Sequence, residues 1–176
     1  MNASKFGLLS LVTLILLSAN TDSDTSKPIQ WQRIEDVLGV AQQPIMIDMY
    51  TEWCGWCKRM DATTFKDPVV ADYVNETFHA VKFDAEQKDS IVFKEYVYKY
   101  VKQGRRGYNE LAAALLDGKM SYPTVVFLDK NLNIITRVPG YQSARDFETI
   151  VHFVGEEAYR TTTWESFKTE YNSRKN

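Results

Sequence analysis

The two cysteines of the chain, Cys54 and Cys57, stand three positions apart and closely follow the apolar run Ile45–Tyr50. With two residues between them, a helix can begin at the first cysteine and carry the second on its first turn, close enough for a small disulfide ring. A helix N-terminus also offers partial positive charge and free backbone N–H groups, which stabilise a thiolate. The pattern therefore favours a buried strand, a turn and a helix, with a reversible dithiol at the turn.

Other uses of such a cysteine pair fit this chain less well. A tetrahedral zinc site needs four ligands, but the chain has no other cysteine, and its histidines, His79 and His152, are far apart. Covalent haem attachment requires a histidine directly after the second cysteine, where this chain has Lys58. A structural staple across so short a loop would restrict the unfolded chain little. We therefore predict a redox-active pair, with no metal and no cofactor other than the disulfide itself.

The composition indicates one globular domain with a single core. Of the 176 residues, 44% are hydrophobic and 13% aromatic, which is enough for one substantial core. The net charge is -2, and basic residues are scattered apart from the adjacent Arg105 and Arg106. Because no phosphate-tracking surface or polybasic patch is evident, we expect no nucleic-acid partner. The sequence leaves the oligomeric state open, and we expect a monomer.

The N-terminus has the layout of an export signal. Lys5 precedes an apolar run, and two small residues, Ser18 and Ala19, follow it. The run has about 12 residues, fewer than the roughly 20 that span a bilayer. We therefore predict a signal peptide over residues 1–19 and a polar linker over 20–29, with an uncleaved membrane anchor as the alternative. In both cases the domain is expected outside the cytoplasm, where disulfide chemistry has substrates.

Hydrophobic periodicity predicts a mixed α/β fold, with helices on both faces of one central sheet. The predicted strands cover residues 45–50, 78–83, 124–128 and 132–138, the last two joined as a hairpin through 129–131. The predicted helices cover residues 31–42, 55–65, 68–76, 91–101, 109–116 and 144–159, with Asp67 as the cap of the third. This pattern gives an α/β domain over 30–160, with a helical insertion at about 88–120, and a helical tail over 161–176.

Several separated segments resemble the thioredoxin superfamily. Trp53-Cys54-Gly55-Trp56-Cys57-Lys58 resembles its active-site turn, and Tyr122-Pro123-Thr124 resembles its cis-proline loop. Asp48, six residues before the first cysteine, is similar to the family's buried acid, and Lys82 to the lysine that faces it. The resemblance covers most of residues 30–156 and implies a thioredoxin fold.

Within the superfamily, the chain most resembles exported members. The residues that carry this likeness are Thr64, Phe65, Asp67, Pro68 and Val70. Among such members it is similar to the C-terminal domain of the transmembrane conduit that feeds reductant into the bacterial periplasm, so we expect a periplasmic protein. It differs from thioredoxin in having Gly-Trp between the cysteines, where thioredoxin has Gly-Pro, and in a longer stretch before the cis-proline.

The resemblance implies how the dithiol works. Cys54, which precedes the helix, would attack a substrate disulfide as a thiolate, and Cys57 would resolve the mixed disulfide. Asp48 would assist the deprotonation of Cys57. The alternative for Asp48 is a structural role as a buried acid paired with Lys82.

The resemblance also implies where a substrate binds. Trp53 and Trp56 would form an apolar platform beside the sulfurs, with core packing as the alternative, more so for Trp56. Tyr122, Pro123 and Thr124 are also expected to bind substrate. Tyr122 would offer a backbone edge to an extended substrate, because a cis peptide at Pro123 turns that edge toward Cys54.

The segment 88–120 lengthens the stretch before the cis-proline loop. Three of its aromatic residues follow helical spacing and are expected to pack in the core, namely Phe93, Tyr96 and Tyr100. We also hypothesise a partner-docking surface near the cis-proline loop, formed in part by Arg105, Arg106 and Tyr108.

Two classes of function remain. The first, which we favour, is an exported thiol–disulfide oxidoreductase that reduces protein or peptide disulfides, with a membrane protein as a possible electron donor. Oxidase or isomerase activity is the alternative within this class. The second is a redox-inactive binding or assembly protein on the same scaffold. The presence of Cys54, Cys57, Asp48 and Pro123 together argues against the second class.

Overall fold

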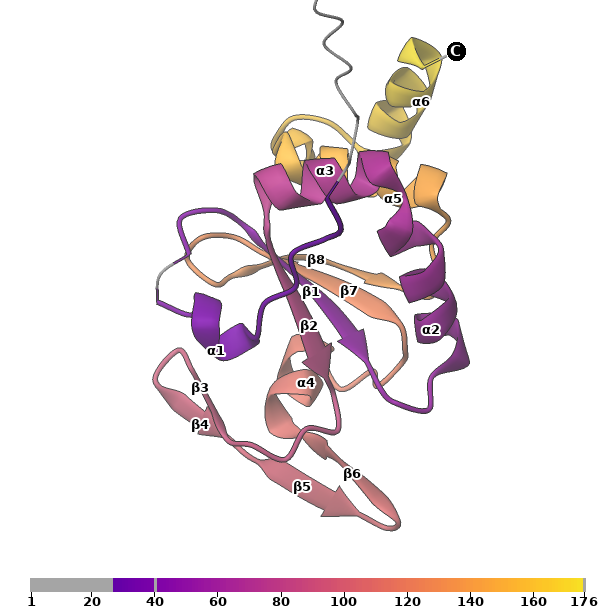
Figure 1. Cartoon of the computed structure of the whole chain (residues 1–176). Coiled ribbons are helices and arrows are strands. Elements are labelled where there is room, and N and C mark those ends of the chain that lie inside the picture. The colour runs from indigo at the N-terminus through magenta and orange to yellow at the C-terminus, as the bar shows by residue number, and fades with distance from the viewer. Residues whose placement is uncertain (1–26, 40, 176) are drawn as a thin grey trace, which may run out of the picture.

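A computed structural model describes residues 27–39 and 41–175 of the chain (Figure 1). The predicted signal peptide and most of the predicted linker lie outside these residues. None of the helices in the described part is both long and apolar enough to cross a membrane.

A four-stranded mixed sheet forms the centre of the fold, in the order β2-β1-β7-β8. Its strands are β1 (Ile45–Tyr50), β2 (His79–Asp84), β7 (Thr124–Leu128) and β8 (Ile134–Pro139). β1 runs parallel to β2 and antiparallel to β7, and β7 runs antiparallel to β8. The predicted strands are therefore confirmed, apart from shifts at their ends.

The largest of these shifts is at the hairpin between β7 and β8. The Asp129 carboxylate accepts hydrogen bonds from the backbone N–H groups of Asn131 and Asn133, and Leu132 has a positive φ of 62°. These contacts close a turn as far as residue 133, so β8 begins at Ile134 and not at the predicted residue 132.

Helices cover both faces of the sheet, as predicted (Figure 1). One face carries α2 (Gly55–Ala62), α3 (Pro68–Thr77) and α5 (Ala144–Gly155), and the other carries α1 (Ile34–Val37) and α4 (Glu110–Leu115). Short 3-10 turns follow α2 and α5 at Thr64–Lys66 and Ala158–Arg160, and α6 (Trp164–Arg174) packs against α5.

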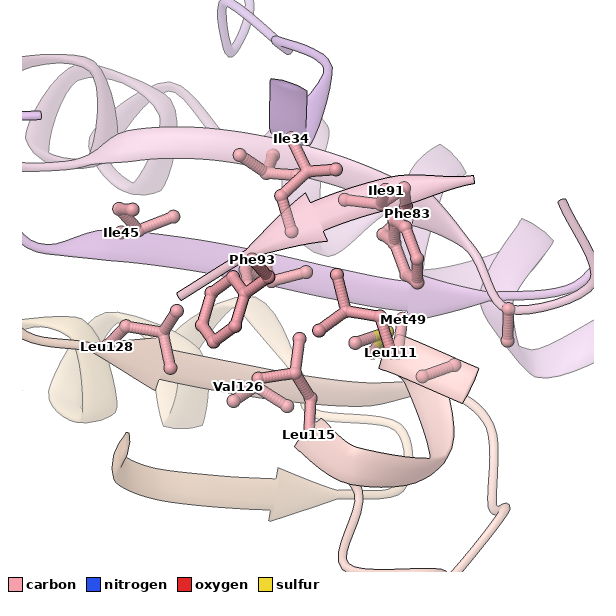
Figure 2. Packing of buried hydrophobic residues seen from close by; sticks show 14 of the residues in the cluster. Ile34, Ile45, Met49, Phe83, Ile91, Phe93, Leu111, Leu115, Val126 and Leu128 are labelled. Carbon is pink, nitrogen blue, oxygen red and sulfur yellow. The ribbon is translucent and has the colours of Figure 1, made fainter. Parts of the chain in front are cut away.

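The hydrophobic core has two halves, because successive side chains of β1 point to opposite faces of the sheet. Ile45 and Met49 pack in the half that contains α1 and α4 (Figure 2). Ile47 belongs to the same half. Met46 packs in the half beneath α2, α3 and α5. Asp48 is two residues further along and so shares this second face, where α2 lies.

The predicted helix over 31–42 is wrong for most of its length, since of its described residues, 31–39 and 41–42, only Ile34–Val37 are helical. The backbone of Gln32 pairs with β2 instead: its N–H donates to the carbonyl of Ala80, and its carbonyl accepts from the N–H of Lys82. The backbone N–H and the backbone carbonyl of Gln32 thus both have hydrogen-bond partners while the residue is extended. Beyond the short helix, Leu38 is extended as well.

The predicted helix over 91–101 is also wrong, because this part of the insertion forms two β-hairpins. They are β3 (Ile91–Phe93) with β4 (Tyr96–Tyr98), and β5 (Tyr100–Gln103) with β6 (Arg106–Asn109). Burial alternates along β3, where Ile91 and Phe93 are buried and Val92 is exposed. This is the two-residue period of a strand, which cross-strand pairing stabilises.

The aromatic residues of the insertion are therefore placed differently from what helical spacing predicted. Phe93 packs in the core, but Tyr96 is exposed and Tyr100 is only partly buried. The helix predicted over 109–116 is confirmed as α4, which Asn109 caps by accepting a hydrogen bond from the N–H of Leu111.

Asp67 caps α3 as predicted, and its contribution to stability can be measured. Its carboxylate accepts hydrogen bonds from the N–H groups of Val69 and Val70 at 3.0 and 3.1 Å. Asp67→Ala is expected to lower the free energy of unfolding by about 1 kcal/mol, because both groups lose their acceptor. In a domain of this size, thermal unfolding followed by circular dichroism should show a fall in Tm of roughly 2–4 °C.

Asp72→Ala is the matched control, because it removes the same charge from an exposed position of the same helix. Equal Tm values for the two variants would mean that the cap contributes nothing.

Candidate active site

Cys54 and Cys57 form a disulfide at the N-terminus of α2, with their Cα atoms 5.3 Å apart. Cys54 is the cap residue, and its sulfur accepts a hydrogen bond from the N–H of Cys57 at 3.0 Å. This N–H and the positive end of the helix dipole favour negative charge on the sulfur. Cys54 is 5% exposed and Cys57 is 2% exposed, so Cys54 is slightly the more accessible.

Asp48 and Lys82 lie at the same register position of the parallel strands β1 and β2. The ammonium group of Lys82 donates to Oδ2 of Asp48 at 2.6 Å, and Asp48 is only 1% exposed. The structure thus brings together the acid and the lysine that the sequence singled out, on the face of the sheet that carries α2.

Burial raises the pKa of Asp48 from its ordinary value of 3.8 to about 6, although the positive charge of Lys82 acts in the opposite direction. In the described part of the chain, Oδ1 of Asp48 is buried without a hydrogen-bond partner, and so is the hydroxyl oxygen of Thr51. A carboxyl group with this pKa can take up or release a proton near neutral pH.

Asp61 belongs to the same cluster, although the sequence reasoning missed it. It lies on α2, one helical turn after Cys57, and its carboxylate forms an ion pair with Lys82. Its side chain is 42% exposed, so the charged cluster extends from the buried Asp48 to the surface. The available signal was the spacing of four residues between Cys57 and Asp61, which puts both on one side of a helix.

The Tyr122–Pro123 peptide bond is cis, and this loop precedes β7. The carbonyl of Pro123 accepts a hydrogen bond from the N–H of Gly140 at 2.8 Å, which fastens the loop to the end of β8. Among the described residues, neither the N–H nor the carbonyl of Tyr122 has a hydrogen-bond partner. The loop therefore presents a backbone edge that an extended chain can pair with.

The side chains of this loop have different surroundings. Thr124 is buried, and its hydroxyl donates to the carbonyl of Ser121 at 2.9 Å, so it holds the loop together from within. Tyr122 is partly buried. Burial raises the pKa of its hydroxyl to about 12, which keeps it protonated.

Trp53 and Trp56 are 50% and 56% exposed, so neither packs in the core. The Trp53 ring lies edge-on to Tyr122, with ring centroids 6.0 Å apart, and the Trp56 ring lies 5.5 Å from that of Tyr141. A surface hollow of about 260 Å³ lies beside Trp56, lined by Trp56, Tyr122, Pro123, Gly140 and Tyr141. The two tryptophans are placed as an apolar platform would require.

Of the residues hypothesised to form a docking surface, Arg106 lies at the site. Its guanidinium carbon is 4.5 Å from the centre of the Trp53 ring. Arg105 lies in the turn between β5 and β6, and Tyr108 is partly buried in β6. The β5–β6 hairpin therefore reaches the Trp53 side of the active site.

Residues 32–155 match the family model described as a thioredoxin-like domain. The chain belongs to the thioredoxin-like family. The predicted thioredoxin fold is confirmed by solved structures as well. A thioredoxin-fold protein from Helicobacter pylori has a TM-score of 0.59 at 20% identity, over 76% of this chain and 86% of that one. The DsbH oxidoreductase has a TM-score of 0.54 at 17% identity, over 85% of this chain and 92% of that one.

Relatives of this thioredoxin-like protein include thiol:disulfide interchange proteins named DsbD. The protein of Pectobacterium atrosepticum is 29% identical over 117 residues, which are 65% of this chain and 17% of the relative. The protein of Yersinia pestis is 27% identical over 141 residues, which are 74% of this chain and 20% of the relative. The chain thus spans about a fifth of the length of these relatives.

The buried Asp48 is expected to make the stability of this thioredoxin-like protein depend on pH. Because folding raises its pKa from 3.8 to about 6, the folded protein holds a proton that the unfolded chain releases. The stabilisation is full below about pH 4 and is lost as the pH rises through 6. Asp48→Asn should therefore be more stable than the natural protein by about 1 to 3 kcal/mol at pH 8, with little advantage at pH 4.

Urea unfolding at both pH values measures this difference, with the exposed Asp72→Asn as the control. An Asp48→Asn variant that is less stable than the natural protein at pH 8 would mean that the ion pair with Lys82 outweighs the cost of burying the charge.

Proposed function

We propose that this protein is an exported thiol–disulfide oxidoreductase that reduces disulfides of proteins or peptides. The observation that carries the proposal is the Cys54–Cys57 disulfide at a helix N-terminus, next to the open backbone edge of Tyr122. Similarity to proteins named for thiol:disulfide interchange supports the same chemistry. The N-terminal sequence pattern supports export.

The reaction proceeds in two exchange steps. The Cys54 thiolate attacks one sulfur of the substrate disulfide, so that a mixed disulfide forms, and the other substrate sulfur leaves as a thiolate that takes up a proton. The Cys57 thiolate then attacks the sulfur of Cys54 and displaces the second substrate thiolate. Two electrons pass to the substrate, and the Cys54–Cys57 disulfide remains. A membrane protein is the proposed donor that reduces it again.

The second step requires the buried Cys57, which is 2% exposed, to lose its proton. Asp48 is the proposed acceptor, because its pKa of about 6 is close to neutral pH and it lies on the face of the sheet beneath α2. Lys82 forms ion pairs with both Asp48 and the partly exposed Asp61. The proton is proposed to pass from Asp48 to solvent along these charged groups.

The substrate segment is proposed to bind as an extended strand along Tyr122. Its side chains would contact Trp53 on one side and the hollow beside Trp56 on the other. Half-exposed aromatic residues suit this task, because they bury apolar area with little loss of side-chain entropy.

Cysteine variants test the proposed order of attack. Cys57→Ser is expected to accumulate a mixed disulfide with insulin, because the attack by Cys54 still occurs and the resolving thiol is missing. Cys54→Ser should form none, and the natural protein should speed the reduction of insulin by dithiothreitol, followed as turbidity. Non-reducing gels and mass spectrometry measure the trapped species.

If the natural protein does not speed insulin reduction and neither variant traps a substrate, the dithiol does not turn over. That outcome would favour the alternative of a binding or assembly protein on this scaffold.

The reduction potential of the Cys54/Cys57 couple tests the direction of the reaction. Equilibration with glutathione is expected to give a value of about -270 mV, as in a reductase that depends on an electron donor. A value of about -120 mV would instead identify an oxidant of newly exported thiols, and an intermediate value of about -180 mV would favour an isomerase.

A further inference from the structure

Trp53, the residue before the first cysteine, is held on two sides. Its indole N–H donates to Oε1 of Glu86 at 2.9 Å, while the guanidinium of Arg106 lies over the ring at 4.5 Å from its centre. At this distance the electron-rich face of the ring attracts the cation. Arg106 is therefore fixed against Trp53, although the two residues are 53 positions apart in the sequence.

The base of the β5–β6 hairpin is anchored by the buried Asn109. Its N–H donates to the carbonyl of Ala85 at 2.7 Å, and its side-chain amide donates to the carbonyl of Asp89 at 3.0 Å. Glu86 lies within the segment that these two bonds hold. One anchor thus positions both Arg106 and Glu86 beside Trp53.

The hairpin is closely packed within itself. A Cβ atom at Gly107 would lie 2.3 Å from the carbonyl oxygen of Val101 and 2.4 Å from the ring of Tyr100. Only glycine therefore allows the Tyr100 ring to lie over this strand. Figure 1 shows the free end of the hairpin extending beyond α4, on the side of the molecule where β1 leads into α2.

The hairpin is basic and has no acidic residue of its own. Residues 100–109 contain Lys102, Arg105 and Arg106 but neither Asp nor Glu. All three cations are exposed, and none forms an ion pair within the described residues. The guanidinium of Arg106 thus has donors available for a carboxylate from another molecule, which it can bind with two parallel hydrogen bonds.

The other tryptophan of the site has a similar neighbour. The guanidinium carbon of Arg59 lies 5.4 Å from the centre of the Trp56 ring and 5.6 Å from that of Tyr141. Arg59 also forms no ion pair in the part of the chain that the structure describes. Each exposed tryptophan beside the disulfide is therefore covered by an arginine without a carboxylate partner.

We propose that Arg106 selects partner proteins that carry an acidic residue next to the cysteine that Cys54 attacks. The inference rests on the proposed oxidoreductase function and names the substrate class of that same site. In the mixed disulfide, the residues that flank the substrate cysteine lie beside Trp53 and hence within reach of Arg106. Glu86 also contacts Trp53, but its Oε1 accepts the indole N–H at the edge of the ring, whereas Arg106 lies over the face of the ring.

Two disulfide peptides that differ only in the residues flanking their cysteines, Glu in one and Lys in the other, test the proposal. The second-order rate constant for oxidation of the reduced protein is measured for each by stopped-flow tryptophan fluorescence at low salt. The natural protein should prefer the Glu peptide by about five- to tenfold, the effect of one exposed charge pair gained and one like-charge pair avoided. The preference should fall at high salt, because surface charges are then screened.

Substitutions at Arg106 and Arg105 test whether the preference needs a positive charge and whether that charge must be at position 106. Arg106→Gln should reduce the preference to within about twofold, and Arg106→Glu should reverse it, whereas Arg106→Lys should keep most of it, because the ammonium retains the charge. Arg105→Gln removes the same charge from the turn of the same hairpin and should keep the preference. A loss of packing alone would slow both peptides equally and leave their ratio unchanged.

Three other outcomes would overturn the inference or its basis. Equal rates of the natural protein with both peptides would refute the acidic preference and leave the oxidoreductase function standing. If Arg105→Gln and Arg106→Gln lost the preference equally, the preference would come from the overall charge of the hairpin and not from Arg106 itself. No reaction of the reduced natural protein with either peptide would refute the proposed function itself.

Discussion

The parallel pairing of β1 with β2 sets Asp48 opposite Lys82 inside the half of the core that lies beneath α2. Burying a carboxylate costs free energy, and the hydrogen bond from Lys82 offsets that cost only in part, since the pKa of Asp48 still rises. A shift of one residue in either strand would turn one member of the pair to the opposite face. The pairing register of β1 and β2 therefore determines whether the site contains both its acid and its lysine.

The parts of the fold that sequence reasoning predicted have signals within a short stretch of chain. Ile45–Tyr50 is a continuous apolar run, and Asp67-Pro68 has the residue types of a helix start. The first hairpin of the insertion lacked such a signal, although the second has Gly104 in its turn. Lys94 and Glu95 form the turn between β3 and β4 with positive φ, which residues other than Gly, Asn and Asp adopt infrequently. Gln32 likewise became extended because of a strand far away in sequence.

The residues of the candidate site likewise fall into those that the sequence indicated and those that only the structure revealed. The cysteine motif indicated the redox pair, and family resemblance indicated Asp48, Lys82 and the cis-proline loop. Asp61 had one local signal, its spacing of four residues from Cys57 on the same helix, but its ion pair with Lys82 depends on where Lys82 points. The hydrogen bond of Glu86 to Trp53 has no local signal in the sequence. Arg106 was named from its charge, but its contact with Trp53 arises only because Asn109 fixes the hairpin to the segment after β2.

The β5–β6 hairpin pairs with itself and with no strand of the central sheet. Its exposed residues can therefore change during evolution without altering the register that holds Asp48 and Lys82, or the helix that holds the cysteines. The partner preference proposed for Arg106 and the redox chemistry therefore depend on separate segments of the domain. Substitutions at a few positions between Val101 and Tyr108 would then change the proposed partner preference during evolution and leave the redox couple unchanged.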